Sequence, residues 1–268
     1  MVGGCGASWI QARFRDTEVS VAVLSIDLAH KSDSDIGVCA LEPRPSDIAV
    51  APIRLSTLGL KGRPTVDALA KGISSLADQL GASLIIIDGP QGWKSPDNGL
   101  LHSRVCEREL ATQGKTGLPG FTKPSNYAPF IAFAIDFFDH LAELGGPRLT
   151  RARPIGSSNR IALESFPTAA WRSLGVRPLP GKARTPASEV RSKLDELRSL
   201  FPLSTPDDLT HDELQALVAG LAGVAAESDD AHGYAVSGIA PFVLDGSWRE
   251  GFIVNPTLEA AGLLRARR

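Results

Sequence analysis

The sequence predicts an α/β fold built on a mixed sheet, and three observations carry that prediction. Short runs rich in β-branched residues occupy positions 18–27, 36–41 and 48–55. Apolar residues then recur at helical spacing between positions 66 and 80. A continuous apolar run follows at 84–87, as expected of a strand that is buried on both faces. Strands and a helix in this order indicate an α/β sheet.

The first three predicted strands form an antiparallel meander, because only short turns at 31–35 and 42–47 separate them. Pro52 lies inside the third strand. Proline lacks the backbone N–H that a central strand must donate, so this strand is expected at an edge of the sheet.

One amphipathic helix follows the meander, with Thr65 as its cap and Gly81 as its left-handed stop. The helix leads to the strand at 84–87, so we interpret it as a crossover that sets this strand parallel to the first by a right-handed connection. Asp27 is the last residue of the first strand, and Asp88 directly follows the strand at 84–87. Both are therefore expected at the carboxyl edge of the sheet, where open α/β sheets bind ligands.

The second half of the chain alternates helices with short strands. Apolar patterns predict helices at 104–113 and 128–144, joined by a Gly/Pro-rich loop at 114–126. A short strand at 161–163 ends on Glu164. Further elements are a helix opened by Thr185 and Pro186, a helix at 211–227 opened by a capping box from Thr210 to Glu213, and a hairpin that joins 242–244 to 251–254.

No internal repeat or linker pattern divides the chain, so we interpret 1–268 as a single domain. Residues 1–16 have the pattern of a loose lead-in, and residues 93–160 that of a helical and loop insertion.

The composition is that of an ordinary globular protein, with 268 residues of which 43% are hydrophobic. The 28 basic and 30 acidic side chains leave a net charge of −2, which gives no global attraction to polyanions. Three scattered cysteines argue for a reducing compartment, so a cytoplasmic location is expected. The most apolar run, 128–138, is shorter than the ~18 residues of a membrane span, and the N-terminus lacks a signal pattern. No membrane partner is expected.

Four acids form the candidate active site: Asp27, Asp88, Glu164 and Asp212. Three lie at the ends of predicted strands, and the fourth lies in the first turn of a helix. Carboxylates gathered at one edge repel each other, and a divalent metal is the usual compensation. Hard oxygen ligands suit Mg²⁺ or Mn²⁺, and two such ions ~4 Å apart can support hydrolysis of a phosphodiester.

Each acid also has a structural interpretation. An acid after an apolar strand is often a turn residue, as Asp88 before Gly89 and Pro90 illustrates. Negative charge in a first helical turn is favoured by the helix dipole, which accounts for Asp212 without a metal. The predicted topology favours the catalytic interpretation, because it places two of the acids on adjacent strands.

The helix at 211–227 has a broad apolar face and an opposed stripe of small residues, so it is expected to be buried on both sides. Asp212 lies at the N-terminal end of the stripe, where close packing would bring its carboxylate to the strand ends. The alternative is that Asp212 remains in solvent. The stripe consists of Ala216, Ala219, Gly220 and Gly223.

These motifs, in their order, resemble a prokaryotic family called domain of unknown function 429, which is described as predicted nucleases with an RNase H-like fold. The motifs are IDLA at 26–29, IDGP at 87–90, RVCER at 104–108, ESFP at 164–167, HDE at 211–213 and EG at 250–251. The resemblance implies a five-stranded sheet of order 3-2-1-4-5. It also implies that Asp27, Asp88, Glu164 and Asp212 are the site carboxylates. Related helices carry a second acid where this chain has Gln215, so the resemblance implies weaker metal binding.

Several cationic side chains could bind the phosphates of a substrate, and we predict this role for Arg104, Arg108 and Lys123. Pairing with acids such as Glu107 is the structural alternative for them. Lys115 and the loop arginines 148, 151, 153 and 160 are further candidates for binding phosphates. Trp93 and Tyr127 could stack on bases or pack in the core. His211 could transfer protons or lie on the surface.

The leading hypothesis is a Mg²⁺- or Mn²⁺-dependent nuclease acting on nucleic-acid phosphodiesters. In this hypothesis Asp27 bridges two ions, Asp88 and Glu164 each hold one, and Asp212 completes the site. One alternative on the same fold is ATP-dependent phosphoryl transfer, although no glycine follows Asp27 to admit ATP phosphates. Another alternative is a catalytically weak protein that binds nucleic acid or a partner.

Overall fold

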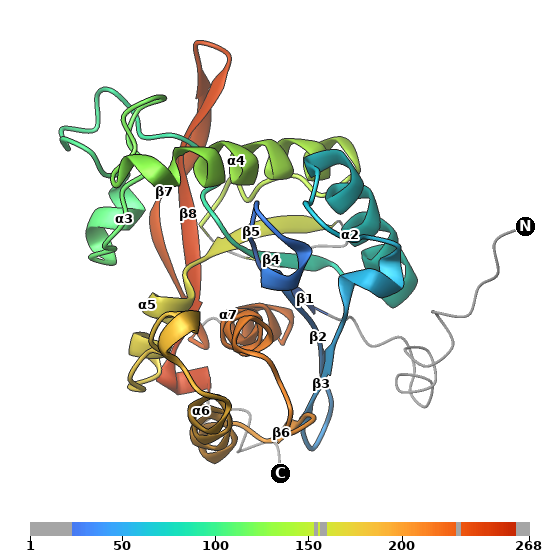
Figure 1. The fold of residues 1–268 in the computed structure, drawn as a ribbon. Helices are drawn as coiled ribbons and strands as arrows, with labels where there is room; N and C mark the ends of the chain where they lie inside the picture. The colour runs from blue at the N-terminus through green and yellow to red at the C-terminus, as the bar shows by residue number, and fades with distance from the viewer. Residues whose placement is uncertain (1–22, 153–154, 156–159, 229–231, 261–268) are drawn as a thin grey trace, which may run out of the picture.

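The computed structural model describes residues 23–152, 155, 160–228 and 232–260, so the predicted lead-in and the start of the first predicted strand lie outside the described residues. One sheet runs through the middle of the molecule in the order β6-β3-β2-β1-β4-β5-β8-β7 (Figure 1). Its central five strands confirm the predicted order 3-2-1-4-5. They are β1 (Val23–Asp27), β2 (Gly37–Pro43), β3 (Ile48–Pro52), β4 (Leu84–Asp88) and β5 (Ile161–Ser165).

The strand directions also agree with the prediction. Strand β2 runs antiparallel to both β1 and β3, whereas β4 is parallel to β1 and to β5. Helix α2 (Val66–Leu80) makes the crossover from the meander to β4, capped by the Thr65 hydroxyl and ended by Gly81 at a φ of 64°. A mixed sheet with this order and these directions is an RNase H-like α/β fold.

Three strands extend this sheet at its edges. A two-residue strand, β6 (Leu203–Ser204), pairs with the start of β3. The C-terminal hairpin of β7 (Tyr234–Leu244) and β8 (Ser247–Pro256) is longer than predicted and joins the other edge alongside β5. Strand β3 is therefore not the last strand of the sheet, so its predicted edge position is wrong. Strand β6 pairs only with Ile48 and Ala49, and Pro52 lies beyond this paired part of β3. The missing N–H of Pro52 therefore needs no partner from β6.

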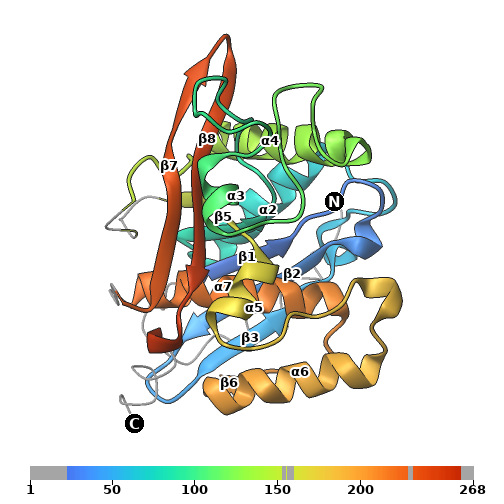
Figure 2. The same ribbon diagram turned by 90° about the vertical axis from the view of Figure 1, so that its left-hand side faces the viewer.

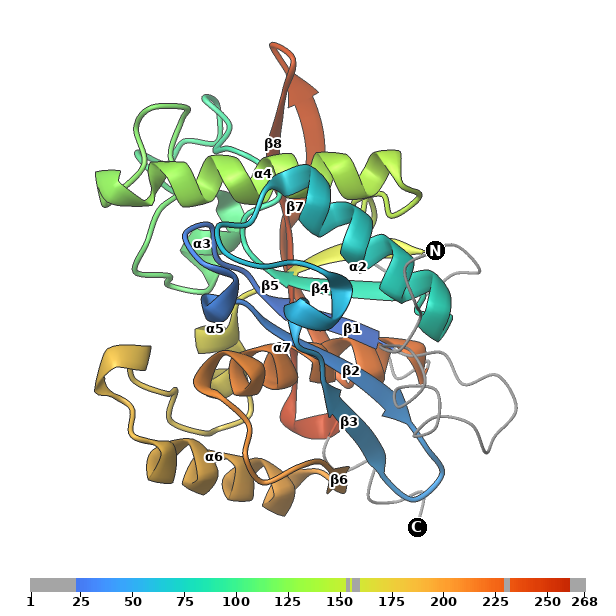
Figure 3. The same ribbon diagram turned by 45° about the vertical axis from the view of Figure 1, so that its right-hand side comes forward.

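Helices cover both faces of the sheet, which gives three layers (Figures 1 and 3). Helix α2 and helix α4 (Ala128–Glu143) pack on the face that carries Leu24 and Ile26. On the opposite face lies α7 (His211–Glu227), with α5 (Pro167–Ser173) and α6 (Ala187–Leu200) outside it (Figure 2).

The small-residue stripe of α7 faces the sheet, as predicted. A Cβ atom at Gly220 would lie 2.9 Å from Cβ of Ser25, and one at Gly223 would lie 2.6 Å from Cγ1 of Val23. Only glycine allows the helix axis to approach the strands this closely. The side of α7 away from the sheet is also buried, so the prediction of a helix buried on both sides is confirmed.

Several boundaries differ from the predictions. Helix α3 (Val105–Glu109) is shorter than the predicted 104–113, because the chain leaves helical geometry at Ala111, with a φ of 50°. Pro186, not Thr185, precedes α6, and the Thr185 hydroxyl bonds loop carbonyls instead. Helix α5, strand β6 and four short 3-10 helices were not predicted. The 3-10 helices are η1 (Asp33–Asp35), η2 (Leu55–Leu58), η3 (Ser125–Tyr127) and η4 (Lys182–Arg184).

Within the described ranges, no helix combines the length and the apolar character that crossing a membrane requires.

Candidate metal centre

Asp27 and Asp88 are register neighbours at the ends of two parallel strands, β1 and β4. Their carboxyl groups are hydrogen-bonded to each other. Burial, followed by the charges of Asp88 and Asp212, raises the pKa of Asp27 well above its usual value. Burial raises the pKa of Asp88 to about 7. Two carboxyl groups in such contact share a proton unless a cation replaces it.

Asp212 comes to the same place from the first turn of α7. Thr210 and Glu213 form the predicted capping box, with the Glu213 backbone N–H donating to Thr210 Oγ1 at 3.2 Å and the Thr210 N–H donating to Glu213 Oε2 at 2.8 Å. This use of Glu213 leaves Asp212 as the acid that turns toward the sheet. Asp212 is buried, with 6% of its surface exposed, so the alternative of a solvent-exposed Asp212 is wrong.

The approach of α7 to β1 depends on Gly37. This residue of β2 pairs with Asp27, and a Cβ atom on it would lie 2.1 Å from the Asp212 carbonyl oxygen. Any larger residue would push the first turn of α7 away from the sheet. Gly37 therefore acts as a positioning residue for Asp212.

Lys182, in η4, supplies a positive charge to this cluster. Its Nζ lies 2.6 Å from Asp212 Oδ2 and 2.8 Å from Asp35 Oδ1. The same charge opposes the rise in the pKa of Asp27. The ammonium group thus offsets part of the repulsion among the buried carboxylates.

His211 adds an imidazole to the carboxylates. Its Nε2 lies 3.0 Å from the Pro180 carbonyl oxygen, which accepts a hydrogen bond from that nitrogen. The other nitrogen, Nδ1, lies 3.1 Å from Asp212 Oδ1. If the ring is neutral, Nδ1 carries a lone pair that faces the negatively charged Asp212 carboxylate, and the two repel each other. A proton or a cation between Nδ1 and Oδ1 removes this repulsion. The hydrogen bond to Asp212 raises the pKa of His211 accordingly.

Asp27, His211 and Asp212 each offer one ligand atom, and these atoms lie within 4.8 Å of one another. Two carboxylates and one imidazole form a suitable donor set for a divalent first-row metal. The imidazole also has the outer contact that metal-bound histidines show, since its second nitrogen donates to a backbone carbonyl. The residues present therefore fit a metal ion.

The structure does not bring Glu164 into this group. Glu164 pairs with Ile87 on β4, and side-chain alternation places it on the face that α4 covers, opposite to Asp27 and Asp88. Its carboxylate accepts two hydrogen bonds from Arg104, at 2.8 Å and 2.5 Å, and one from the Gln91 N–H at 3.0 Å. Its charge still contributes to the raised pKa of Asp88. The metal-ligand role of Glu164 stays a prediction.

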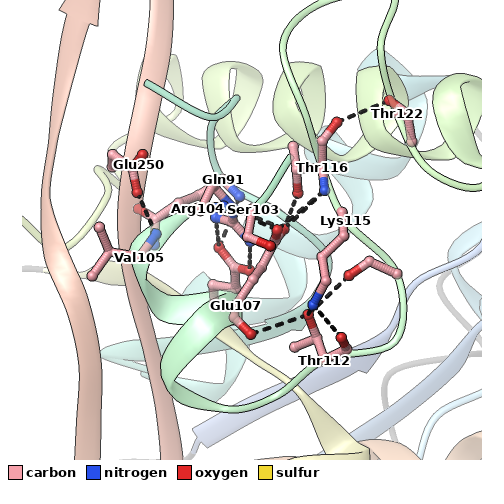
Figure 4. Close-up of polar contacts among 12 residues, drawn as sticks. Gln91, Ser103, Arg104, Val105, Glu107, Thr112, Lys115, Thr116, Thr122 and Glu250 are labelled. Carbon is pink, nitrogen blue, oxygen red and sulfur yellow. Dashed lines mark hydrogen bonds and ion pairs between the residues drawn. The ribbon is translucent and has the colours of Figure 1, made fainter. Parts of the chain in front are cut away.

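Arg104 belongs to a buried network, drawn in Figure 4. Only 2% of its surface is exposed, and its guanidinium also contacts Glu107 Oε1 at 3.1 Å. Glu107 in turn accepts hydrogen bonds from Thr116. The structural alternative of pairing with acids is therefore confirmed for Arg104, although Arg104 also lines the neighbouring cavity.

Glu250 organises the loop that carries Arg104. It is fully buried, and its carboxylate accepts the N–H groups of Ser95 and Val105, both at 2.8 Å, and the Asn98 side-chain amide at 2.6 Å. Glu250 itself has a φ of 57°. The predicted EG motif at 250–251 thus holds the start of α3.

The other candidate cations divide into two groups. Arg108 and Lys123 are exposed, which leaves them accessible to a ligand. Arg148 pairs with Asp139 at 2.8 Å and stacks 4.7 Å from the Trp248 ring centre, and Arg160 pairs with Asp78. Arg148 and Arg160 therefore hold the fold together. Arg151 is exposed, and Arg153 lies outside the described residues.

Gln215 does not face the centre. Its Oε1 accepts a hydrogen bond of 2.7 Å from Nε1 of Trp171, a fully buried residue of α5. Position 215, where the resemblance implies an acid, is therefore used for packing in this chain.

Sequence reasoning missed Gly37, Lys182 and the ligand role open to His211. An isolated glycine at the start of a strand pattern is a signal of close backbone approach, so Gly37 was detectable. Lys182 opens the short 3-10 helix η4, and no local pattern connects it to residue 212.

The sheet order and the carboxylates at its edge define an RNase H-like α/β protein with an acid-rich centre. No family model matches the chain, and no curated protein matches it. Among solved structures, the chain is similar to the crystal structure of the yeast mitochondrial Holliday junction resolvase Ydc2. The identity is 9%, the TM-score is 0.42, and 84% of this chain and 89% of that chain are covered. The fold assignment therefore rests on the strand order itself, and the resemblance to the domain of unknown function 429 family stays a prediction.

Proposed function

We propose that the protein is a divalent-metal-dependent nuclease that hydrolyses nucleic-acid phosphodiesters, as a member of the domain of unknown function 429 family acting in the cytoplasm. The observation that supports this most is the convergence of Asp27, His211 and Asp212 ligand atoms within 4.8 Å, beside Asp88. Four ionisable groups gathered in a partly buried place are costly, and a metal cofactor would offset that cost.

In this proposal, Asp27 and Asp212 would hold the ion through carboxylate oxygens, and His211 would hold it through Nδ1. A divalent ion bound by these residues would supply activation of a water molecule and stabilisation of negative charge on a phosphodiester. The pKa of Asp88, about 7, lies near neutral pH, which is where a general base is most effective. Asp88 therefore suits the role of general base, and its carboxylate could also serve as a further metal ligand. An imidazole ligand favours Mn²⁺ over Mg²⁺.

The test is cleavage of labelled DNA and RNA, single- and double-stranded, with Mn²⁺ or Mg²⁺. Asp27→Asn and Asp212→Asn are expected to lose at least ~100-fold in rate, because each removes a charged ligand. Asp67→Asn is the matched control, since Asp67 is exposed on α2 and pairs with Lys71. Unchanged cleavage by Asp27→Asn would refute the proposal, and so would the absence of cleavage on every substrate.

A second candidate function is binding of nucleic acid without efficient catalysis. The observation that favours it is the engagement of Gln215 with Trp171, which leaves the centre one acid short of related helices. Binding by the wild type with no metal-dependent turnover would support this second candidate.

A further inference from the structure

A cavity of about 260 Å³ lies next to the candidate metal centre, and nothing in the proposed chemistry yet uses it. Asp88 and Glu164 line it together with Arg104. Its remaining walls come from the loop after α3, from the start of α4 and from the turn between β5 and α5. The cavity is smaller than the roughly 300 Å³ at which pockets for drug-sized ligands begin. It therefore suits one small group.

The walls of this cavity combine aromatic rings with polar groups. Tyr127, Phe130 and Phe166 line it, and all three are partly or largely exposed although most large apolar side chains of the fold are buried. The ring of Tyr127 lies over the backbone of Gly114, where an added Cβ atom would be 3.2 Å from the ring. Partly exposed aromatic side chains beside polar groups are the kind of surface on which a nucleobase stacks.

A second cation, Lys115, lines the cavity besides Arg104. Its ammonium donates to the carbonyl and hydroxyl oxygens of Thr112, which are both neutral (Figure 4). Lys115 and Lys123 face each other across an antiparallel bridge, with backbone hydrogen bonds of 2.8 Å and 3.0 Å. Like charges directly opposite each other in such a pair are destabilising. An anionic phosphate between them would relieve that repulsion.

We propose that this cavity receives one unstacked base of a nucleic-acid strand, with Tyr127 stacking on the base and Lys115 contacting an adjacent phosphate. The inference rests on the proposed function, because it takes the strand to lie across Asp88 and its neighbours. A base can enter the cavity only if it is unpaired. The protein therefore prefers single-stranded or locally unpaired nucleic acid to continuous duplex.

The test measures binding in EDTA, so that it does not depend on hydrolysis. The probes are a fluorescent ten-nucleotide single strand containing 2-aminopurine, a blunt hairpin duplex of the same sequence, and a free mononucleotide. The single strand is expected to bind more tightly than the duplex and the mononucleotide, with quenching of the 2-aminopurine. Tyr127→Ala is expected to weaken binding of the single strand roughly five- to hundredfold and to abolish the quenching, whereas Tyr127→Phe keeps both.

Lys115→Ala is expected to lower the slope of log affinity against log salt by about 0.7, which a purely structural role would not change. Phe121→Ala is the matched aromatic control, since Phe121 is 67% exposed in the same loop. Lys71→Ala, on α2, is the matched cation control.

Equal affinity for duplex and single strand, or unchanged affinity in Tyr127→Ala, would overturn the inference. A mononucleotide that binds as tightly as the oligonucleotide would overturn the assignment to a polymer. The proposed function would fail separately, if the protein cleaved no substrate with a metal ion but still bound single strands through Tyr127.

Discussion

Gly37 lies directly beneath Asp212: a Cβ atom on this glycine would sit 2.1 Å from the Asp212 carbonyl oxygen. Gly37 is also the register partner of Asp27. One residue without a side chain thus sets the distance between the two carboxylates that come from β1 and α7.

Gly37→Ala is therefore expected to separate Asp27 from Asp212. The clash is with backbone, so α7 must shift, and overpacking of this kind costs about 1–3 kcal/mol of stability. Affinity for Mn²⁺, measured by isothermal titration calorimetry, should fall more than about tenfold, as for loss of a supporting contact. Gly72→Ala is the control, because its nearest neighbour is the flexible end of Leu60 at 3.2 Å. If Gly37→Ala binds Mn²⁺ like the wild type, close packing does not position the site.

The sequence predicted those parts of the site that local patterns determine. Asp27 and Asp88 follow strands joined by a crossover, and that topology fixes their proximity. The capping box and the small residues of α7 predicted the burial of Asp212. The partner of Glu164 was not predictable in this way, because Arg104 is 60 residues away and reaches it from an irregular loop.

The register between β4 and β5 explains why Glu164 lies apart from the other acids. Glu164 lies one position short of register with Asp88, so alternation turns the two carboxylates to opposite faces. An acid that follows an apolar run marks the end of a strand, but it does not show which face of the sheet the acid lies on. Only the observed pairing of β4 with β5 settles the face.

The Asp88 carboxyl group should make stability depend on pH in metal-free solution. Its folded-state pKa is about 7, against a usual value of 3.8. Between these values the folded protein binds a proton that the unfolded chain has lost, so the free energy of unfolding falls as pH rises from about 4 to 7. Asp88→Asn removes this penalty. It should raise Tm by several degrees at pH 8, at about 2–4 °C per kcal/mol, and have little effect near pH 4.

Thermal melts in EDTA from pH 4.5 to 8 provide the measurement, with Asp67→Asn as the control on an exposed acid. A constant difference between wild type and Asp88→Asn across that range would contradict a carboxyl group that is protonated in the fold.

Metal binding should release a proton from His211. The hydrogen bond to Asp212 raises the pKa of His211, so Nδ1 carries a proton in metal-free protein at slightly acidic pH. A metal ligand must be unprotonated, and Mn²⁺ affinity should therefore fall as pH falls through this raised pKa. Titration calorimetry in buffers of different ionisation enthalpy counts the protons released. His211→Asn should release fewer protons per Mn²⁺ than the wild type, and His140→Asn, on α4, should release the same number. Identical proton release by His211→Asn would exclude His211 from the site.

Loss of the Arg104 side chain should strongly destabilise the fold. It holds Glu107 and Glu164, and all three are at least 96% buried, with exposures of 2%, 4% and 3%. Removing the cation leaves two buried carboxylates unpaired, which costs about 3–5 kcal/mol. Arg104→Met should therefore lower Tm by roughly 10 °C. Arg104→Lys should restore little, because an ammonium cannot match the two parallel hydrogen bonds to Glu164.

A double-mutant cycle separates this electrostatic cost from a packing defect. Glu164→Gln should destabilise the wild type, since it breaks the ion pair, but should stabilise Arg104→Met, since it removes an unpaired charge. Urea denaturation of the four proteins gives the free energies of unfolding, and Arg151→Met controls for loss of an exposed arginine. If Glu164→Gln changed the free energy of unfolding by the same amount in both backgrounds, Arg104 would act through packing alone. Only a carboxylate left without its cation can make Glu164→Gln stabilising instead of destabilising.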